Sequence, residues 1–493
     1  MSVPTMPMIN RAQERATLEA LFQKGTHQLA LLYGRRRVGK TYLLNHVWPG
    51  KQVFYFTAAE TTEAQNRDAL VRDLADWTGE PLRAEDYPSW RAVFRLLLDL
   101  KAPEPIVVVL DEFQHLGAEV ADLGSIASEL NAVWEQRRPS RSFVLVLSGS
   151  AIKALEALNA GGAPLYGRFN AIVDIKPFDY GHSNEMAPFR ALRDRVRCYS
   201  AFGGTPLYLS MIDRRESIEQ NIARLLLAPR GAVRGLIETA LVQERGLRDV
   251  AKYQAILRAI GTGSTELSTI RTRAGLTGDA DTAVRRMVER LIDLGYVRAD
   301  RNIGAHGTAA FRFRIDDPAF AFYYEYVPRY ETALIRNDPL MIWTRYIAPT
   351  FDGYVGHVFE RIAEQAYRRL QSRTTLPMID HWGRWEGVDR DRSSLEVDIV
   401  APLVDGRVLS GGVKWNSVTP IAAKWHYQHM DQLRRLAASG VKWAHEALKP
   451  TSPLLWVAAS GFSAEFRRAI ESEREEVHLW DLAALYQRAS RIL

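Results

Sequence analysis

The segment from Gly34 to Thr41 has the pattern G-x-x-x-x-G-K-T, and each of its fixed residue types suits the binding of a chain of phosphates. Gly34 and Gly39 would let successive backbone N–H groups turn toward phosphate oxygens. The Lys40 ammonium would reach the β- and γ-phosphates, and the Thr41 hydroxyl would ligate Mg²⁺. A chance glycine-rich turn is the alternative. The predicted nucleotide-binding residues are Gly34, Arg35, Arg36, Arg37, Val38, Gly39, Lys40, Thr41 and Tyr42.

Two acids, Asp111 and Glu112, follow an apolar run that starts at Ile106. In open α/β sheets, ligands collect at the carboxyl ends of the strands. Asp111 would then hold Mg²⁺ directly or through water, and Glu112 would orient and deprotonate the attacking water. A plain transition from strand to loop is the alternative, but the preceding phosphate-binding pattern favours the catalytic interpretation.

Three further residues could take part in the same chemistry. Ser148 and Ser150 end another apolar run, and either hydroxyl could sense the γ-phosphate. The alternative is that they only cap the helix expected from Ala151. Arg168 precedes the apolar segment Ile172 to Ile175 and could stabilise charge during phosphoryl transfer. An ordinary surface arginine is the alternative there.

A second candidate site lies near the other end of the chain, where Glu360 falls in an expected helix and Asp398 and Lys414 in adjoining expected strands. This pattern resembles the restriction-endonuclease-like core, in which such residues gather a divalent metal around a phosphodiester. Gly412 stands where the pattern has a second acid. Glu396 lies on the same strand face as Asp398 and could supply the missing carboxylate. Because Mg²⁺ prefers a nearly complete oxygen shell, the missing carboxylate favours a scaffold with relic residues over a working nuclease.

Between these two sites, three short helical patterns precede two segments that alternate like a hairpin around a loop at 300–309. Three helices and a hairpin indicate a winged helix. Its third helix carries Arg285, Arg286 and Arg290, which could face a DNA major groove. Winged helices also serve as rigid protein-docking modules, so DNA contact is one of two alternatives.

The elements that position the first site follow from hydrophobic periodicity. Apolar runs that read as buried strands alternate with segments of helical spacing, which is typical of a parallel sheet covered by helices. The predicted fold class is α/β: a P-loop NTPase domain with a parallel sheet, a helical lid, a winged helix and a C-terminal α/β domain like restriction endonucleases. The predicted domains span residues 1–180, 181–248, 249–335 and 346–493.

Composition narrows the class of protein. Hydrophobic residues make up 47% and charged residues 25% of the 493 residues, as in ordinary soluble proteins. No apolar run approaches the ~18 residues that a membrane span needs, and we expect a cytoplasmic protein without membrane contact. The single cysteine, Cys198, excludes an internal disulfide and a cysteine-based zinc site. The net charge of +6 is too diffuse to establish nucleic-acid binding.

The first half of the chain resembles the prokaryotic STAND-type AAA+ ATPases, the signal-transduction ATPases with numerous domains. The matching segments are Gly34 to Thr41, Asp111 to Gln114, Gly149-Ser150, Leu165 to Arg168 and Phe202 to Leu209. The resemblance implies ATP and Mg²⁺ as ligands, and it implies that the C-terminal part is a domain of unknown function that commonly follows such ATPases. In this family, winged helices often act as intramolecular clamps.

These observations predict a nucleotide switch: an ATPase with slow or regulated hydrolysis, whose lid and winged helix respond to the γ-phosphate and alter what the C-terminal domain binds. One alternative is an ATP-gated, metal-dependent DNA nuclease, and another is a DNA-binding regulator in which ATP only stabilises the fold. The expected partners are ATP, DNA through the winged helix and C-terminal domain, and a protein partner or a second copy of the chain.

Overall fold

The computed structural model describes residues 8–23, 27–100, 106–117, 122–136, 143–187, 189–244, 247–305, 307, 311–371, 375–415 and 418–486. The chain forms two compact units. The first consists of Met1–Pro177, Thr205–Leu207 and Val242–Arg248, and the second of Phe178–Gly204, Tyr208–Leu241 and Asp249–Leu493. Part of the expected hairpin loop, residues 306, 308 and 309, lies outside the described residues. The expected division into four domains stays a prediction.

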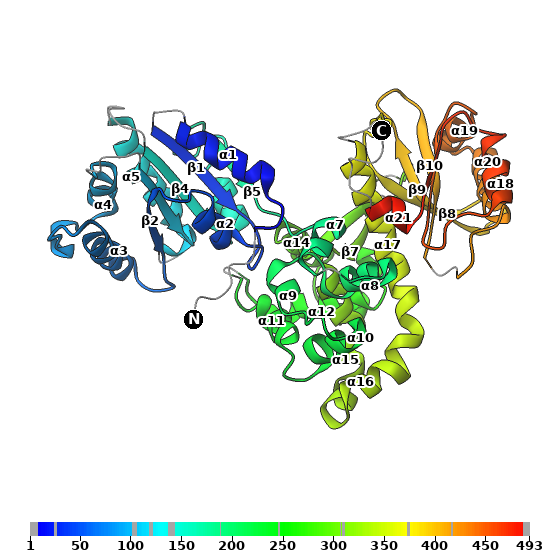
Figure 1. The fold of residues 1–493 in the computed structure, drawn as a ribbon, viewed down its shortest axis with the longest axis horizontal. Coiled ribbons are helices and arrows are strands. Elements are labelled where there is room, and N and C mark those ends of the chain that lie inside the picture. The colour runs from blue at the N-terminus through cyan, green and yellow to red at the C-terminus, as the bar shows by residue number, and fades with distance from the viewer. Residues whose placement is uncertain are drawn as a thin grey trace. The chain divides into compact units, whose positions relative to one another are not determined.

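A parallel sheet of five strands forms the centre of the first unit, with the strand order β2-β3-β4-β1-β5 (Figure 1). Its strands are β1 (His27–Tyr33), β2 (Gln52–Thr57), β3 (Ile106–Asp111), β4 (Phe143–Gly149) and β5 (Ala171–Asp174). Every residue of β3 and β4 is buried, as expected for strands covered on both faces. This arrangement confirms the predicted α/β fold class.

Helices cover both faces of this sheet because alternate residues of each strand point to opposite sides. Leu29 and Leu31 pack on one side with α3 (Glu63–Thr78), α4 (Trp90–Leu98), α5 (Leu123–Gln136) and α6 (Ile152–Ala157). Ala30 and Leu32 pack on the other side with α1 (Ala12–Gln23) and α2 (Lys40–His46). Two short 3₁₀ turns, Ala84–Asp86 and Phe113–His115, complete the connections. The carboxyl ends of the strands therefore form one edge between two layers of helix.

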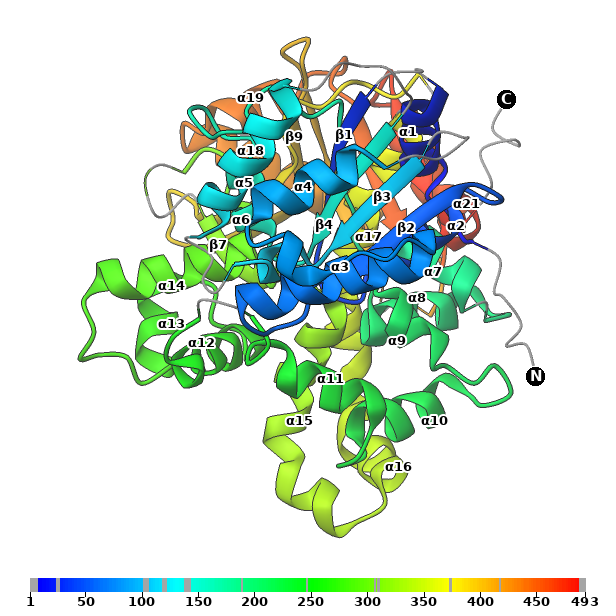
Figure 2. The same cartoon turned by 90° about the vertical axis from the view of Figure 1, so that its left-hand side faces the viewer.

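The second unit begins with short helices. They are α7 (Tyr180–Met186), α8 (Leu192–Phe202), α9 (Pro206–Ser210, which begins in the first unit), α10 (Ile218–Ile222), the π-helical turn Ala223–Leu227 and α11 (Ala232–Ala240). Three helices follow, α12 (Val250–Gly261), α13 (Leu267–Arg273) and α14 (Asp281–Asp293), and they lie beside one another in Figure 2. The antiparallel hairpin of β6 (Val297–Arg301) and β7 (Phe311–Ile315) comes next. Element types and order agree with the three helices and hairpin expected from the sequence.

Two long helices lead into the last sheet. They are α15 (Pro318–Arg336) and α17 (Ala348–Gln371), and between them lie α16 (Pro339–Ile342) and the π-helical turn Trp343–Ile347. The segment 336–345, which lies between the predicted domains 249–335 and 346–493, is thus largely helical. Among the described residues, no helix is long and apolar enough to cross a membrane.

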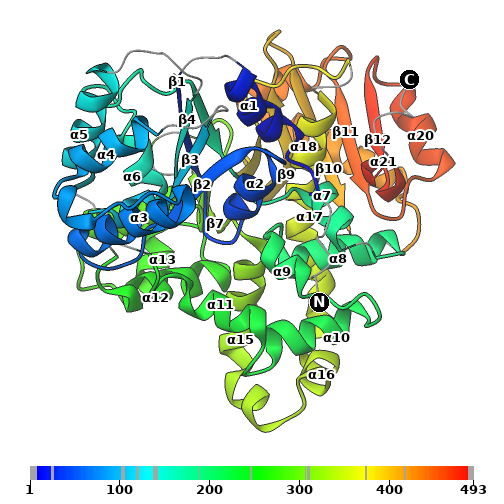
Figure 3. The ribbon, with the colours of Figure 1, turned by 60° about the vertical axis from the view of Figure 1, so that its left-hand side comes forward.

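The last sheet is mixed, with the order β12-β11-β10-β9-β8, and Figure 3 labels its strands β9 to β12. Its strands are β8 (Gly383–Val388), β9 (Ser394–Pro402), β10 (Val408–Lys414), β11 (Leu454–Ala458) and β12 (Val477–Trp480). The helices after β10 are α18 (Lys424–Ala438), α19 (Lys442–Ala447), α20 (Ala464–Glu471) and α21 (Leu482–Tyr486). Ile303, from the turn after β6, is buried in the core of this sheet with Trp385, Leu395 and Trp443. The hairpin therefore contributes to the core of the C-terminal part.

One histidine is deeply buried in this part of the chain. His429 on α18 is 4% exposed, and its Nε2 lies 3.2 Å from the Ser410 hydroxyl. Its ring also meets the edge of Trp456. Burial, together with the nearby charges of His426, Arg474 and Lys414, lowers the pKa of His429 to about 3. The folded chain therefore holds this side chain neutral at pH values where an unfolded chain would protonate it.

We expect His429→Gln to reduce the loss of stability in mild acid. Between the ordinary pKa of about 6.5 and the folded value of about 3, the unfolded state binds a proton that the folded state does not, so wild-type stability falls as pH falls. The slope from this one group approaches about 1.4 kcal/mol per pH unit, or roughly 1 kcal/mol between pH 7 and pH 5.5. Urea unfolding followed by tryptophan fluorescence at these two pH values measures the difference.

His445→Gln is the matched control, because His445 is exposed on the adjacent helix α19. It should keep the wild-type pH dependence. Equal pH dependence in wild type and His429→Gln would contradict the expectation.

Candidate functional site

The loop between β1 and α2 has the geometry that its glycines predict. A Cβ on Gly34 would lie 2.3 Å from the Ile175 carbonyl oxygen, so no side chain fits at this position. Gly39 has φ of +93°, in the left-handed region that glycine tolerates. Lys40 is 6% exposed, and its ammonium donates to the carbonyls of Gly34 at 2.9 Å and Arg35 at 3.0 Å. The lysine thus folds back over the loop, and its charge is held by two of the loop carbonyls.

Burial lowers the pKa of Lys40, and the nearby carboxylates of Glu112 and Asp111 partly oppose this effect. The charge of Arg36 adds to the lowering. A buried ammonium held by two carbonyl oxygens is a poorly neutralised cation, which favours the arrival of an anion. Phosphate oxygens are such a partner.

The other predicted loop residues play different parts. Arg37 takes a left-handed backbone conformation with φ of +71°, and its guanidinium donates to the Gln243 side chain at 3.0 Å. Val38 is buried, and its carbonyl accepts from Arg11 at 3.1 Å. Tyr42 is 38% exposed and stacks on the ring of His46. The side chains of Arg37 and Tyr42 therefore lie at the surface around the loop.

Asp111 lies at the end of β3 and accepts hydrogen bonds from three directions. Its Oδ2 accepts from the Thr41 hydroxyl at 3.0 Å and from the Tyr55 hydroxyl. Its Oδ1 accepts from the Glu112 backbone N–H at 2.9 Å. Burial, with the carboxylate of Asp111, raises the pKa of Tyr55 well above its ordinary value, so this phenol remains a donor at neutral pH. The two predicted Mg²⁺ ligands, Thr41 and Asp111, are therefore adjacent.

Glu112 follows at once, with a left-handed backbone at φ of +51°. Such a conformation is uncommon for a residue other than glycine and turns the side chain out of the strand direction. Its Oε2 accepts from the Ser150 hydroxyl at 3.0 Å and from the Gln114 amide, and Gln114 also donates to Ser150 at 3.2 Å. A Cβ on Gly149 would lie 2.0 Å from Gln114 Oε1, so this glycine makes room for the glutamine.

Two other predicted residues differ from the residues above, Ser148 by its burial and Arg168 by its position along the sheet. Ser148 is fully buried within β4, and its hydroxyl has no hydrogen-bond partner among the described residues. Arg168 pairs with Glu135 at 2.7 Å. The nearby Asn170 bonds to both backbone groups of Leu29, which lies five residues before Gly34, or about 17 Å along an extended strand. Arg168 therefore lies near the opposite end of the sheet from its own phosphate-binding loop.

The second predicted site is only partly assembled. Lys414 lies 3.0 Å from Asp398, whereas Glu360 pairs with Arg384 at 3.3 Å. A Cβ on Gly412 would lie 2.7 Å from the Trp456 ring, which packs beside the glycine on the neighbouring strand β11. The space of a second acid is therefore taken by an indole.

The third helix of the central bundle presents its arginines to solvent. On α14, Arg285 and Arg286 are exposed and Arg290 is half-buried. No ion pair joins any of them to an acid within the described ranges. The apolar side of the helix, with Val284, is turned to the core. These three side chains are thus available to an external anion.

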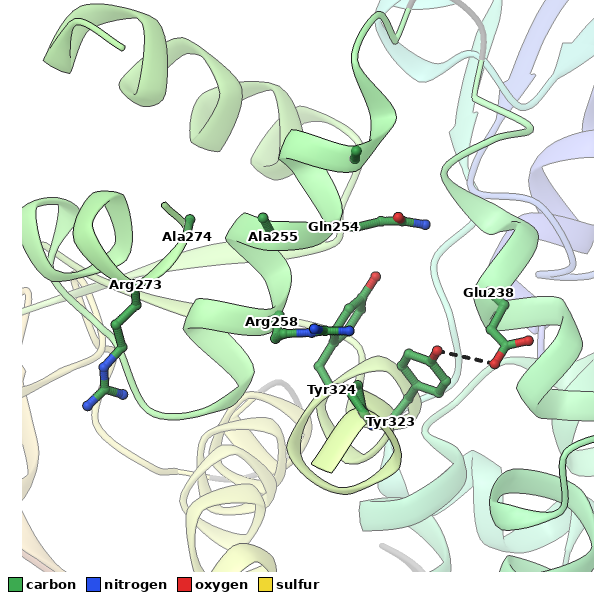
Figure 4. Close-up of a pocket in the computed structure, with 10 residues that line it drawn as sticks. Glu238, Gln254, Ala255, Arg258, Arg273, Ala274, Tyr323 and Tyr324 are labelled. Atoms are coloured by element: carbon green, nitrogen blue, oxygen red, sulfur yellow. Dashed lines mark hydrogen bonds between the residues drawn. The ribbon is translucent and has the colours of Figure 1, made fainter. Parts of the chain in front are cut away.

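A cavity of about 450 Å³ lies elsewhere in the second unit, between α11, α12 and α15 (Figure 4). Tyr323 donates to Glu238 at 3.2 Å, and Glu238 also accepts from Arg234 at 2.7 Å. Arg273 donates to the Thr262 carbonyl at 2.9 Å. The described residues that line the cavity include no glycine-rich loop and a single carboxylate, Glu238. Its groups do not form a phosphate-binding constellation, and the loop at Gly34 remains the better nucleotide site.

Sequence reasoning gave no role to three residues of the first site: Tyr55, Gln114 and Arg11. Tyr55 reaches Asp111 because β2 and β3 pair in a register that places Thr57 opposite Asp111. The sequence of either strand alone does not predict this register. Arg11, 7% exposed, joins the loop carbonyl of Val38 to that of Lys176. Gln114 entered only as the last residue of the matching segment Asp111 to Gln114. Its position two residues after Glu112 was the feature of the sequence that could have indicated their contact.

Comparison with protein families matches two parts of the chain. Residues 8–212 match an ATPase domain found predominantly in Archaea. Residues 323–425 match a domain of archaeal and bacterial proteins of unknown function. The combination expected from the sequence, a P-loop ATPase domain followed by this C-terminal domain, is confirmed.

Individual relatives are distant. The uncharacterised protein MJECL04 of Methanocaldococcus jannaschii is 23% identical over 434 residues, which cover 87% of this chain and 92% of the relative. The Walker-type ATPase PABY2304 of Pyrococcus abyssi is 21% identical with a TM-score of 0.48, covering 64% of this chain and 96% of that one. A STAND protein with a tetratricopeptide repeat sensor, PH0952 of Pyrococcus horikoshii, is 13% identical with a TM-score of 0.28, covering 75% and 52%.

We expect Gly34→Ala to weaken nucleotide binding by at least about tenfold, because the new methyl group would overlap the Ile175 carbonyl and force the loop backbone to move. Titration of the folded variant with a fluorescent ATP analogue measures the change. Gly124→Ala on α5 is the control, since no atom of the described part of the chain lies within 4 Å of a Cβ there. Unaltered affinity in Gly34→Ala would show that the loop does not hold the phosphates.

Proposed function

We propose, from the premise that residues 8–212 form a P-loop ATPase domain of this predominantly archaeal family, that the chain hydrolyses ATP and acts as a nucleotide-dependent switch. One observation carries the proposal: the side chains of Lys40, Thr41, Asp111 and Glu112 converge at the carboxyl edge of one parallel sheet. Ligand sites of open α/β sheets lie at this edge. We assign the activity to the cytoplasm, where ATP is available and Cys198 would stay reduced.

Each residue has a distinct role in the proposed reaction. Lys40 would exchange its two loop carbonyls for phosphate oxygens, which are stronger acceptors because they are charged. Thr41 and Asp111 would hold Mg²⁺, which neutralises the developing charge on the phosphates when bound. Glu112 would accept a proton from the attacking water.

The contacts of Glu112 support slow or regulated turnover. Its Oε2 already accepts from Ser150 and Gln114, so the same oxygen is less available to a water molecule. A switch follows if a γ-phosphate competes for these donors and changes the position of Glu112. We propose that this change is passed to the helical lid and winged helix of the second unit and alters what the C-terminal domain binds. ADP would then correspond to the other state.

Arg168 has no part in this scheme on its own chain, because it lies near the far end of the sheet. If it contributes to phosphoryl transfer, it does so from a second copy of the protein or by contact with another partner.

Binding of DNA is the second candidate function, and the exposed arginines of α14 favour it. Uncompensated arginines on one helix face are the electrostatic footprint of duplex binding. The nuclease alternative has less support, since Trp456 fills the space beside Gly412 and Asp398 is paired with Lys414.

We expect Lys40→Ala to lose ATP affinity by at least about tenfold, because the variant lacks the cation nearest the phosphates. We expect Glu112→Gln to keep ATP affinity and to turn over at least ~100-fold more slowly, since general-base assistance contributes about 10²–10⁴. Isothermal titration and phosphate release measure the two quantities on the same preparations. ATP binding by Lys40→Ala at wild-type strength would refute the site, and full turnover by Glu112→Gln would assign the base elsewhere.

A separate expectation concerns DNA. Replacing Arg285, Arg286 and Arg290 by alanine should weaken duplex binding and flatten its salt dependence by up to about three phosphate contacts. Filter binding across a salt series gives the slope. An equal loss of charge at Arg329, Arg336 and Arg345, which lie outside α14, is the control and should leave the slope nearly unchanged. The same slope in both triple variants would leave the winged helix as a protein-docking element.

A further inference from the structure

The carboxylates of the last sheet and of α17 are neutralised by cations of the chain itself. Arg384 of β8 lies 3.3 Å from Glu360 of α17, 3.6 Å from Glu386 of β8, and in direct contact with Glu396 of β9. The remaining acid, Asp398, lies 3.0 Å from Lys414. One guanidinium thus joins carboxylates from three elements.

Arg384 is a buried cation. Its exposed fraction is 7%, and its Nε has no hydrogen-bond partner among the described residues. Burial by itself would lower the pKa of Arg384, but the surrounding carboxylates of Glu360, Glu396 and Glu386 raise it above its ordinary value. The charge is therefore retained because the acids surround it.

The pKa of Glu360, the partner of Arg384, is likewise set by burial and by opposing charges. Burial would raise the pKa of Glu360, yet His357, whose Nδ1 lies 3.7 Å from the carboxylate, and the charges of Arg384 and Arg314 bring it below the ordinary value. Removal of one partner from a buried ion pair leaves the other charge uncompensated, which is costly. Without Arg384, Glu360 would keep only Arg314 and His357 nearby, and a further cation or a proton would be favoured.

The backbone of Arg384 is also fixed by hydrogen bonds. The Arg384 carbonyl accepts a hydrogen bond from the Ile303 N–H at 2.9 Å. The neighbouring Asn302 forms an isolated parallel β-bridge with Arg384. The hairpin turn therefore fixes the strand from which Arg384 extends. Its place among the carboxylates does not depend on a flexible loop.

We infer that Arg384 takes the place of a divalent cation in the C-terminal part, and that loss of its guanidinium would convert Glu360 and Glu396 into ligands for Mn²⁺ or Mg²⁺. Oxygen donors from two elements, already drawn to one positive charge, are the donors that such ions prefer. An ion would have access, because Arg384 lines cavities of about 380 Å³ and 580 Å³. Within the described residues, no three acidic, histidine or cysteine side chains are placed to hold a metal.

This inference does not rest on ATP turnover, and it would give the nuclease-like pattern of Glu360, Asp398 and Lys414 a structural purpose. In the native chain Glu360 and Asp398 would pair with the internal cations Arg384 and Lys414, and these contacts would keep the sheet, α17 and the hairpin together. The C-terminal part would then function without a metal.

The test is Mn²⁺ binding, measured by electron paramagnetic resonance on the full chain without nucleotide. An Asp111→Asn background removes the acid of the phosphate site from the measurement. Arg384→Met, which keeps the bulk and loses the charge, should bind Mn²⁺ at least about tenfold more tightly than the parent. Arg384→Lys keeps a cation and should not. Arg298→Met is the matched control, because Arg298 lines the same two cavities but pairs with Asp300 and Glu364.

Adding Glu396→Gln to Arg384→Met should abolish the gained Mn²⁺ signal. If Arg384→Met does not fold alone, it should fold when Mn²⁺ is present, as followed by circular dichroism. The inference is overturned by a folded Arg384→Met that binds no more Mn²⁺ than the parent, by failure to fold both with and without Mn²⁺, or by a parent that binds Mn²⁺ through Glu396.

Discussion

The carboxylate of Asp111 accepts hydrogen bonds from Thr41, Tyr55 and the backbone of Glu112, and these three contacts connect α2, β2 and the end of β3. A buried carboxylate needs such donors because it cannot be solvated by water. The same contacts fix the phosphate-binding loop relative to the residue that would activate water. The first unit thus positions its chemistry through one charged group at the edge of a sheet.

Close packing against glycine has opposite consequences in the two halves of the chain. Next to Gly149 the free space is filled by Gln114, which donates to Glu112 and so belongs to the candidate site. Next to Gly412 it is filled by the indole of Trp456, which adds apolar packing and no ligand. Both glycines are required for steric reasons, but only the first serves a polar network.

Sequence reasoning predicted the parallel sheet and the proximity of Thr41 and Asp111, because parallel strands end at a common edge. It could not place Tyr55 at Asp111, since that contact depends on the register between β2 and β3. The position of Arg168 likewise depends on which end of the sheet its loop reaches.

The role of Arg384 was missed for a related reason. A search for acids and a lysine at metal-site spacing overlooks a cation on a neighbouring strand that already occupies the space between the acids. Such a contact is set by the pairing of β8 with β9 and by the packing of α17.

The burial of Ile303 bears on how this protein could be rearranged during evolution. The part of the chain shared with the family of unknown function starts at residue 323, yet the core around Trp385 and Trp443 includes this earlier isoleucine. A gene fusion that transferred only the shared part would leave an apolar hole where Ile303 packs and an unpaired strand edge at β8. The segment that the family shares is therefore shorter than the segment that completes this core. A successful transfer would have to include the hairpin of β6 and β7.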